Sequence, residues 1–262
     1  MTGRRRQRGL ALVSVLWAIA ILSLIAAAML TASVTSARIG RNVWDATRAG
    51  AVADAVVNRA ILSLMDERTK RQPRVDGVPA DMVYDGMHVR MWVQDESGEI
   101  NINTAEKALL QALFTAQGLG DAAASALADA VIARRSPQAP YQATDDLLSV
   151  PGMSRTLFGR IAPLITVYGH AGSVNVEVAP REVLRVLPGM TDQAISDALK
   201  ARETARAQVL ASDEASPASL AQANAVFVVT AEVRGERAHV VRGAAVMFTG
   251  DESNPYIVLG WQ

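Results

Sequence analysis

Few residues in this chain have the types and the spacing that catalysis requires. Its three histidines, His88, His170 and His239, lie far apart, and none has the spacing that binds a metal on one helix face. The 262-residue chain has no cysteine, which excludes a thiol nucleophile, a thiolate metal site and a disulfide framework. It also lacks a Gly-x-Ser-x-Gly sequence and a glycine loop of the phosphate-binding kind. We therefore predict that the chain is not an enzyme.

Two Pro-Gly turns suggest a different chemistry, the binding of phosphate. Val150-Pro151-Gly152-Met153 and Leu187-Pro188-Gly189-Met190 each precede a helical pattern, as in a helix-hairpin-helix, whose glycine turn lets backbone amides approach a DNA phosphate. Such binding needs a basic stripe, but the formal net charge is zero. Acidic residues also lie close to the turns: Asp145, Asp146, Asp192, Asp197 and Glu203. A membrane-anchored DNA-binding protein is therefore an alternative, and nucleic acid is not the expected partner.

The first structural element that the sequence predicts is a membrane-spanning segment near the N-terminus. Four arginines lie within residues 4–8, and an uncharged run extends from Leu10 to Ala37. About 23 apolar residues at about 1.5 Å each cross a hydrocarbon core of about 30 Å as a helix. Arginines stay on the cytoplasmic side, so the C-terminal domain should be exported. We expect a single-pass protein with a transmembrane helix over residues 10–37.

The helical pattern continues beyond the membrane segment. Apolar residues recur at three- and four-residue steps along one helix face from Ala49 to Met65. Only Gly40 and Gly50 interrupt the stretch from Leu10 to Arg71, which contains no proline. The pattern predicts one very long helix, with a membrane anchor, a loop near Gly40 and a separate helix as the alternative.

Strand patterns lie on both sides of a helical middle region. Residues 87–94 alternate with period two, and valine-rich runs cover residues 225–233, 239–248 and 256–261. We predict an α+β fold in which the long N-terminal helix packs on an antiparallel sheet, with a large all-α insertion of helical hairpins between strands. The expected parts are an amphipathic helix and first strands over 38–99, the insertion over 100–224, and C-terminal strands over 225–262.

The insertion contains an internal repeat. Ile100-Asn101-Ile102-Asn103 and Val174-Asn175-Val176-Glu177 each lead into a helical pattern that meets a glycine turn. The following helices are expected to end at Ala133-Arg134 and Ala201-Arg202. The short side chain of asparagine can accept a hydrogen bond from the unpaired backbone N–H groups at the start of a helix, so we expect these asparagines to cap helices.

The leader and the first repeat together resemble a known family. Gln7-Arg8-Gly9-Leu10, followed by a leucine- and alanine-rich helix, resembles a type IV prepilin leader, and Asp95-Glu96-Ser97-Gly98-Glu99-Ile100-Asn101-Ile102-Asn103 resembles the signature of the type II secretion system minor pseudopilin K family (general secretion pathway protein K). The resemblance implies a pilin-like fold and a leader at residues 1–9. It also implies cleavage by prepilin peptidase between Gly9 and Leu10, with methylation of the new Leu10 amine.

The resemblance further implies a place in the bacterial inner membrane and a role in protein export across the outer membrane. The chain would form or cap the tip of the pseudopilus, with minor pseudopilins of the I, J and H types as partners. Pilin-like chains usually carry a glutamate at the fifth mature position, where this chain has Ser14, and a tip subunit needs no such carboxylate. Ser14, Ala18 and Ala26 are expected membrane-helix contacts. A related type IV pilus tip subunit shares the leader and is an alternative.

Calcium is the cofactor that the resemblance implies, in the strand-bearing domain. Asp95, Glu96, Asp251 and Glu252 are the candidate oxygen ligands. The chain departs from the family pattern in its short linker, residues 135–144, and in Asn175-Val176-Glu177, which is not Asn-x-Asn. A conventional signal cut near Ala26-Ala27-Ala28 is a further alternative, and it would remove the membrane stem.

Overall fold

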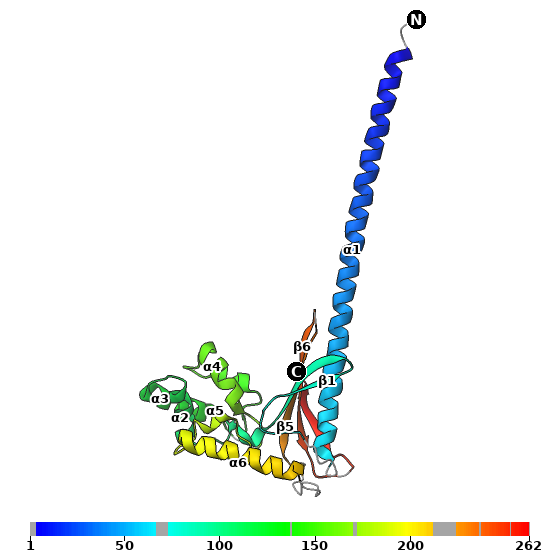
Figure 1. The fold of residues 1–262 in the computed structure, drawn as a ribbon. Helices are drawn as coiled ribbons and strands as arrows, with labels where there is room; N and C mark the ends of the chain where they lie inside the picture. Colours follow the sequence, from blue (N-terminus) through cyan, green and yellow to red (C-terminus); the bar gives the residue numbers. More distant parts are fainter. Residues whose placement is uncertain are drawn as a thin grey trace.

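A long helical stem and a two-part head make up the structure, a computed structural model (Figure 1). It describes residues 4–66, 73–136, 138–169, 172–211, 224–235, 237–251 and 253–261. Helix α1 (Arg4–Met65) extends far beyond the head and carries the N-terminus at its distant end. The head consists of a sheet beside the C-terminal part of α1 and a helical body at the side of that sheet.

Helix α1 confirms the prediction of one continuous helix. It is 62 residues long and passes through Gly40 and Gly50 without a break, so a loop near Gly40 is wrong. The predicted end at Arg71 lies outside the described residues. From residue 12 to residue 44 its side chains are exposed, whereas its buried face starts at Ala49 and ends at Leu64. The exposed face of the second half carries the polar residues Asn58 and Arg59 beside Ala51 and Leu62, and the continuous apolar stripe on its other face explains why this half packs on a sheet.

Five antiparallel strands form the sheet in the order β1-β2-β5-β6-β7. Their bounds are β1 (Ala80–Tyr84), β2 (Met87–Asp95), β5 (Val226–Arg234), β6 (His239–Phe248) and β7 (Tyr256–Trp261). Helix α1 packs against β2, β5 and β6, and the shared core is rich in valine. Phe227 and Phe248 meet edge to face in it, with ring centroids 5.4 Å apart. The predicted antiparallel sheet is confirmed, and β1 is a strand that the sequence reading missed.

The helical body lies between β2 and β5 in the chain and has a hydrophobic core of its own. Its helices are α2 (Lys107–Ala116), α3 (Asp121–Arg134), α4 (Arg155–Ile161), α5 (Arg181–Leu184) and α6 (Asp192–Ala211), with 3-10 turns η1 (Glu96–Gly98), η2 (Thr144–Ser149) and η3 (Ala162–Leu164). Two differences from the prediction stand out. The body is not all-α, because β3 (Ile100–Asn101) pairs in parallel with β4 (Ile165–Thr166). Helix α6 also continues nine residues past the expected end at Arg202, to Ala211.

Candidate functional site

The stem is the first candidate site, because it leaves a long apolar surface uncovered. Leu12, Trp17 and Leu24 are 70%, 66% and 71% exposed, and the other large apolar side chains of this stretch are open as well. One helix among the described residues is long and apolar enough to cross a membrane, and it is this one. A helix with such a surface is compatible with a single-pass membrane anchor.

The predicted processing and contact residues all lie on this stem. Gly9 and Leu10 belong to α1, although their side chains lie outside the described part of the structure. Ser14, Ala18 and Ala26 are exposed on the apolar half, where small side chains allow a second helix to approach closely. Their placement is compatible with contacts to neighbouring stems, which stay a prediction.

The second candidate site is the junction of the sheet and the helical body, and the asparagine repeat builds it. Asn101 is 7% exposed and donates from Nδ2 to the carbonyls of Tyr168 and Gly169 at 2.7 and 2.9 Å. Its Oδ1 accepts a hydrogen bond from the backbone N–H of Asn103 at 2.8 Å. Asn103 in turn donates to the carbonyl of Tyr141 and accepts from its N–H. These asparagines tie separate loops together.

The second asparagine forms the same local turn at the surface. Asn175 accepts from the N–H of Glu177 at 3.0 Å, as Asn101 accepts from Asn103. Helix α2 begins six residues after Asn101, and α5 begins six residues after Asn175. Neither asparagine therefore caps a helix, and the capping prediction is wrong. Each one closes an Asx turn that precedes the helix.

The two parts of the head touch where η1 meets the second repeat. The N–H of Asn175 donates to the carbonyl of Ser97 at 2.8 Å. Gly98 lies so close to the backbone of residues 178 and 179 that an added Cβ would stand 2.8 Å from the Val178 oxygen and 2.9 Å from Ala179 atoms. Residues 95–99, at the end of strand β2 and directly after it, thus form a contact between the sheet and the helical body. The sequence of these residues did not predict that role.

Three carboxyl groups, those of Asp95, Glu96 and Glu99, surround this contact, and no described cation forms an ion pair with any of them. Burial raises the pKa of Glu96 to about 7, against a hydrogen bond from Thr166 that lowers it, and the charge of Asp95 raises it further. Burial and then the charge of Glu96 raise the pKa of Glu99. Burial also raises the pKa of Asp95, although its carboxylate accepts a hydrogen bond from the Ser97 N–H at 2.8 Å. Burial at the junction therefore favours the protonated form of each of these carboxyl groups more than water does.

Glu96 and Glu99 also line a cleft between the outer face of the sheet and the helical body. The cleft has a volume of about 510 Å³, and Trp92, Leu199 and Arg202 are among its other walls. Arg202 donates to the carbonyls of Ala179 and Val176, while its Nε is buried without a hydrogen-bond partner among the described atoms. The guanidinium is thus engaged with main chain and does not neutralise the two carboxyl groups.

Calcium does not fit the residues that the structure describes. Asp95 and Glu96 lie in the buried junction, whereas Asp251 lies in the exposed β6–β7 loop and accepts from the N–H and hydroxyl of Ser253 at 2.8 and 2.7 Å. Over the described ranges, no three histidine or acidic side chains gather into a group that could hold a metal. The fourth predicted ligand, Glu252, lies outside those ranges.

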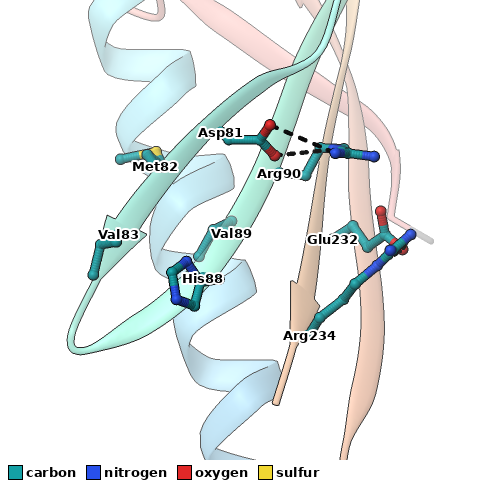
Figure 2. Close-up of a pocket in the computed structure, with 8 residues that line it drawn as sticks. All are labelled: Asp81, Met82, Val83, His88, Val89, Arg90, Glu232 and Arg234. Carbon is teal, nitrogen blue, oxygen red and sulfur yellow. Dashed lines mark hydrogen bonds and ion pairs between the residues drawn. The ribbon is translucent and has the colours of Figure 1, made fainter. Parts of the chain in front are cut away.

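A shallow hollow on the sheet gathers charges that already neutralise one another. Figure 2 shows Asp81 facing Arg90 across strands β1 and β2, and Nε of Arg90 is 3.0 Å from Oδ1 of Asp81. Glu232 accepts from Arg234 at 2.8 Å and lies 2.7 Å from Nε2 of His239. These two partners, Arg234 first, lower the pKa of Glu232. We find no unpaired charge here that would select a ligand.

The same hollow corrects the expectation that the histidines are scattered. Strand register sets His88 opposite Arg234, and Arg234 opposite His239, so two histidines reach one end of the sheet. His170 lies outside the described residues. His239 pairs with Glu232, whose Oε1 lies 2.7 Å from its Nε2.

The helical body contains three helical hairpins with a common turn. Gly118, Gly152 and Gly189 have φ angles of 93°, 92° and 81°, which favour glycine. Each turn leads directly into a helix, namely α3, α4 and α6. Exposed arginines lie beside two of these turns, Arg155 after Gly152 and Arg185 before Gly189. Two other cations are engaged within the body: Lys107 pairs with Asp129 at 2.7 Å, and Arg134 stacks on the Tyr141 ring. The turns of the predicted helix-hairpin-helix elements are therefore present.

Comparisons with known proteins agree with these hairpins and add little beyond them. The family model of the helix-hairpin-helix motif matches residues 95–166, well under half of the chain. A chain in the crystal structure of the GspK-GspI-GspJ complex from the enterotoxigenic Escherichia coli type 2 secretion system is similar, at 14% identity and a TM-score of 0.48, over 87% of this chain and 97% of that one. That likeness is too weak to carry a functional conclusion. No protein with a curated description matches.

Proposed function

We propose that this chain is a minor pseudopilin of a type II secretion system. One observation carries the proposal: a single helix has an uncovered first half, residues 12–44, which is uncharged up to residue 37, and a second half with one face buried against an antiparallel sheet, residues 49–64. This division separates membrane anchoring from folding, because the head needs nothing from the first half of the helix. A subunit can then be stored in the inner membrane and join an assembly through its stem without refolding.

Processing would prepare the stem for assembly. The arginines of residues 4–8 hold the leader in the cytoplasm, and the small Gly9 leaves the following bond accessible to prepilin peptidase. Cleavage gives a chain that starts at Leu10 with an apolar helix. The stem then packs with the stems of I-, J- and H-type minor pseudopilins, and the heads remain in the periplasm.

Two features favour a place at the tip. Ser14 has no carboxylate that could pair with the N-terminal amine of a neighbouring subunit, and a subunit with no neighbour above it needs none. The helical body extends sideways from the sheet, away from α1, and widens the head far beyond the width of the stem (Figure 1). A head of that breadth would leave little room for another head on top.

The mass and N-terminal sequence of the full chain, extracted from its own inner membrane, test this proposal. A chain that begins at methylated Leu10 supports a pseudopilin. A chain that begins near Ala28 is a conventional exported protein, and one that retains Met1 is a simple anchored domain; either of these contradicts the proposal.

A second function, DNA binding, is favoured by the helix-hairpin-helix match to residues 95–166 and by the glycine turns at Gly118 and Gly152. Retention on DNA or heparin at low salt tests it. Binding that disappears with rising salt supports a phosphate contact, whereas flow-through at the lowest salt excludes it. A type IV pilus tip subunit shares the leader and the stem, and loss of secretion without loss of pili in a deletion strain separates the two.

A further inference from the structure

Strand β7 leaves one edge of the sheet open. It is the last strand in the order β1-β2-β5-β6-β7 and pairs with β6 alone among the described strands. Its outer row of backbone N–H and C=O groups therefore has no strand partner in the described part of the chain. Such a row is a template for one more strand, because an extended segment satisfies every second residue with paired hydrogen bonds.

The β7 edge is apolar and has no charge. Ile257, Val258, Leu259 and Trp261 are 41%, 37%, 39% and 50% exposed, and no charged residue lies between positions 253 and 261. The opposite edge, β1, presents Asp81 in an ion pair with Arg90. Proteins protect free edges with charges of that kind, and β7 has none. The β7 edge can therefore pair with a strand that is itself uncharged.

The core side of β7 is also open. Val258 lies opposite Val246, and Trp261 lies opposite Ala244, so these pairs share the face that α1 covers. Val246 and Ala244 are 0% and 1% exposed, whereas their β7 partners are 37% and 50% exposed. The helix packs on β2, β5 and β6, and its cover ends before β7. An occupant must therefore bring an apolar face together with its strand, as the edge of a folded sheet does.

Membrane anchoring decides the direction of the occupant. Arg48 pairs with Asp85 at 2.9 Å, and Asp54 lies 3.7 Å from Arg242, so β6 runs in the same direction as α1 and β7 runs back toward the membrane end. Figure 1 shows the strands beside the lower part of the stem. A two-fold axis that pairs two β7 strands antiparallel would point the two stems in opposite directions. Two copies in one membrane cannot adopt that arrangement.

We propose that β7 is an assembly edge that accepts an uncharged, apolar edge strand from a different pilin-like chain anchored in the same membrane. Every strand pair in this sheet is antiparallel, so the partner strand runs antiparallel to β7 and in the same direction as α1. This inference rests on the proposed function, since it is that function which supplies pilin-like neighbours of the same orientation.

Thiol labelling in cells tests the edge, and the cysteine-free chain makes it clean. The Ile257→Cys variant places one thiol on β7, and the Val83→Cys variant places one on β1, where Val83 is 62% exposed. Each full chain is labelled with a maleimide in intact cells and again after extraction in detergent. We expect Ile257→Cys to react at least about tenfold more slowly in cells, the effect of a partner at ten times its dissociation constant, and Val83→Cys to react alike in both.

Three outcomes overturn the proposal. Equal labelling of Ile257→Cys in cells and in detergent shows a free edge. Oxidation of Ile257→Cys to a disulfide-linked homodimer shows that a second copy covers it. Protection that persists when Leu259→Lys is added shows that the cover is not a paired strand, because a lysine on the edge opposes strand addition. A chain that starts at Leu10 yet labels freely refutes the edge alone, whereas one that retains Met1 refutes the proposed function.

Discussion

Arg135 donates a hydrogen bond from Nη1 to the backbone carbonyl of Ile102 at 3.1 Å, just beyond the end of α3. Arg202 makes the equivalent contact from Nη2 to the carbonyl of Val176, in the middle of α6. In both cases the acceptor is the residue that follows the repeat asparagine. In each hairpin an arginine, at the end of the second helix in one copy and within it in the other, thus holds the turn that precedes the first helix.

Backbone hydrogen bonds show that these two turns are copies of each other. The N–H of Ala105 donates to the carbonyl of Asn101 at 2.7 Å, and the N–H of Ala179 donates to that of Asn175 at 3.0 Å. The copies differ in burial, because Asn101 is buried and Asn175 is exposed. The repeat therefore offers a matched pair of sites in one molecule.

Replacing each of the two asparagines by alanine should show whether the stability contribution comes from burial of the asparagine or from the turn that both copies share. Asn101→Ala removes three partly buried hydrogen bonds, two to the carbonyls of Tyr168 and Gly169 and one from the N–H of Asn103, at a cost of about 1–3 kcal/mol in the free energy of unfolding. Asn175→Ala exposes its partners to water and should cost less than about 1 kcal/mol. Urea unfolding of the full chain in detergent measures both. Equal losses would contradict this account of the junction.

Periodicity explains which parts of the fold were predictable. The period-3.6 face from Ala49 to Leu64 and the period-two strand of residues 87–94 have enough length to identify α1 and β2. Strands β3 and β4 have two residues each, too few for any periodic signal, and β1 has only five. The short elements therefore escaped prediction, although they complete the sheet and the junction.

The site was less predictable than the fold, because its chemistry depends on contacts between distant segments. The family resemblance implied that Asp95 and Glu96 are calcium ligands. Packing of residues 178 and 179 onto Gly98 buries the segment instead. The sequence of residues 95–99 alone does not predict that residues 178 and 179 pack against them.

Gly98→Ala should weaken the contact between the two parts of the head. The new methyl would stand 2.8–2.9 Å from main-chain atoms of residues 178 and 179, which cannot move as a flexible side chain does. We expect a loss of about 1–3 kcal/mol in the free energy of unfolding. Gly159→Ala in α4 is the control, because no atom lies within 4 Å of its added Cβ, and it should gain up to about 1 kcal/mol. A neutral Gly98→Ala would show that the junction is loosely packed.

Stability should fall as pH rises through the range in which Glu96 ionises. Its folded pKa of about 7 lies above the ordinary 4.5, so folding favours the protonated form. The stabilisation is complete below pH 4.5 and is lost between about pH 4.5 and 7, by no more than about 3.5 kcal/mol at about 1.4 kcal/mol for each unit of pKa.

Unfolding of the wild type and two variants at pH 5 and pH 8 measures this effect. Glu96→Gln keeps a polar partner for Thr166 and should remove the part of the decline that Glu96 contributes, while Glu99, whose pKa burial raises to about 10, continues to lower stability as pH rises. Glu106→Gln on the exposed surface should leave the decline unchanged. A wild type that is more stable at pH 8 than at pH 5 would show that these carboxyl groups are hydrated.

Gly9→Val should block maturation of the chain. A β-branched side chain beside the Gly9–Leu10 bond hinders the approach of a peptidase that works at the membrane surface, and it stiffens the backbone that must bend into the enzyme. The precursor should then accumulate in the inner membrane with its leader, residues 1–9, still attached. Mass spectrometry of the extracted chain detects it.

Gly3→Val is the matched control, because it makes the same change within the leader but away from the bond that is cut. It should be processed at the normal rate. If both variants mature normally, the leader is not read by a prepilin peptidase, and the exposed apolar half of α1 serves only as an anchor. If both accumulate as precursors, the block reflects insertion of the leader and not the cleaved bond. Only a difference between the two variants assigns cleavage to Gly9 and connects the stem to pseudopilus assembly.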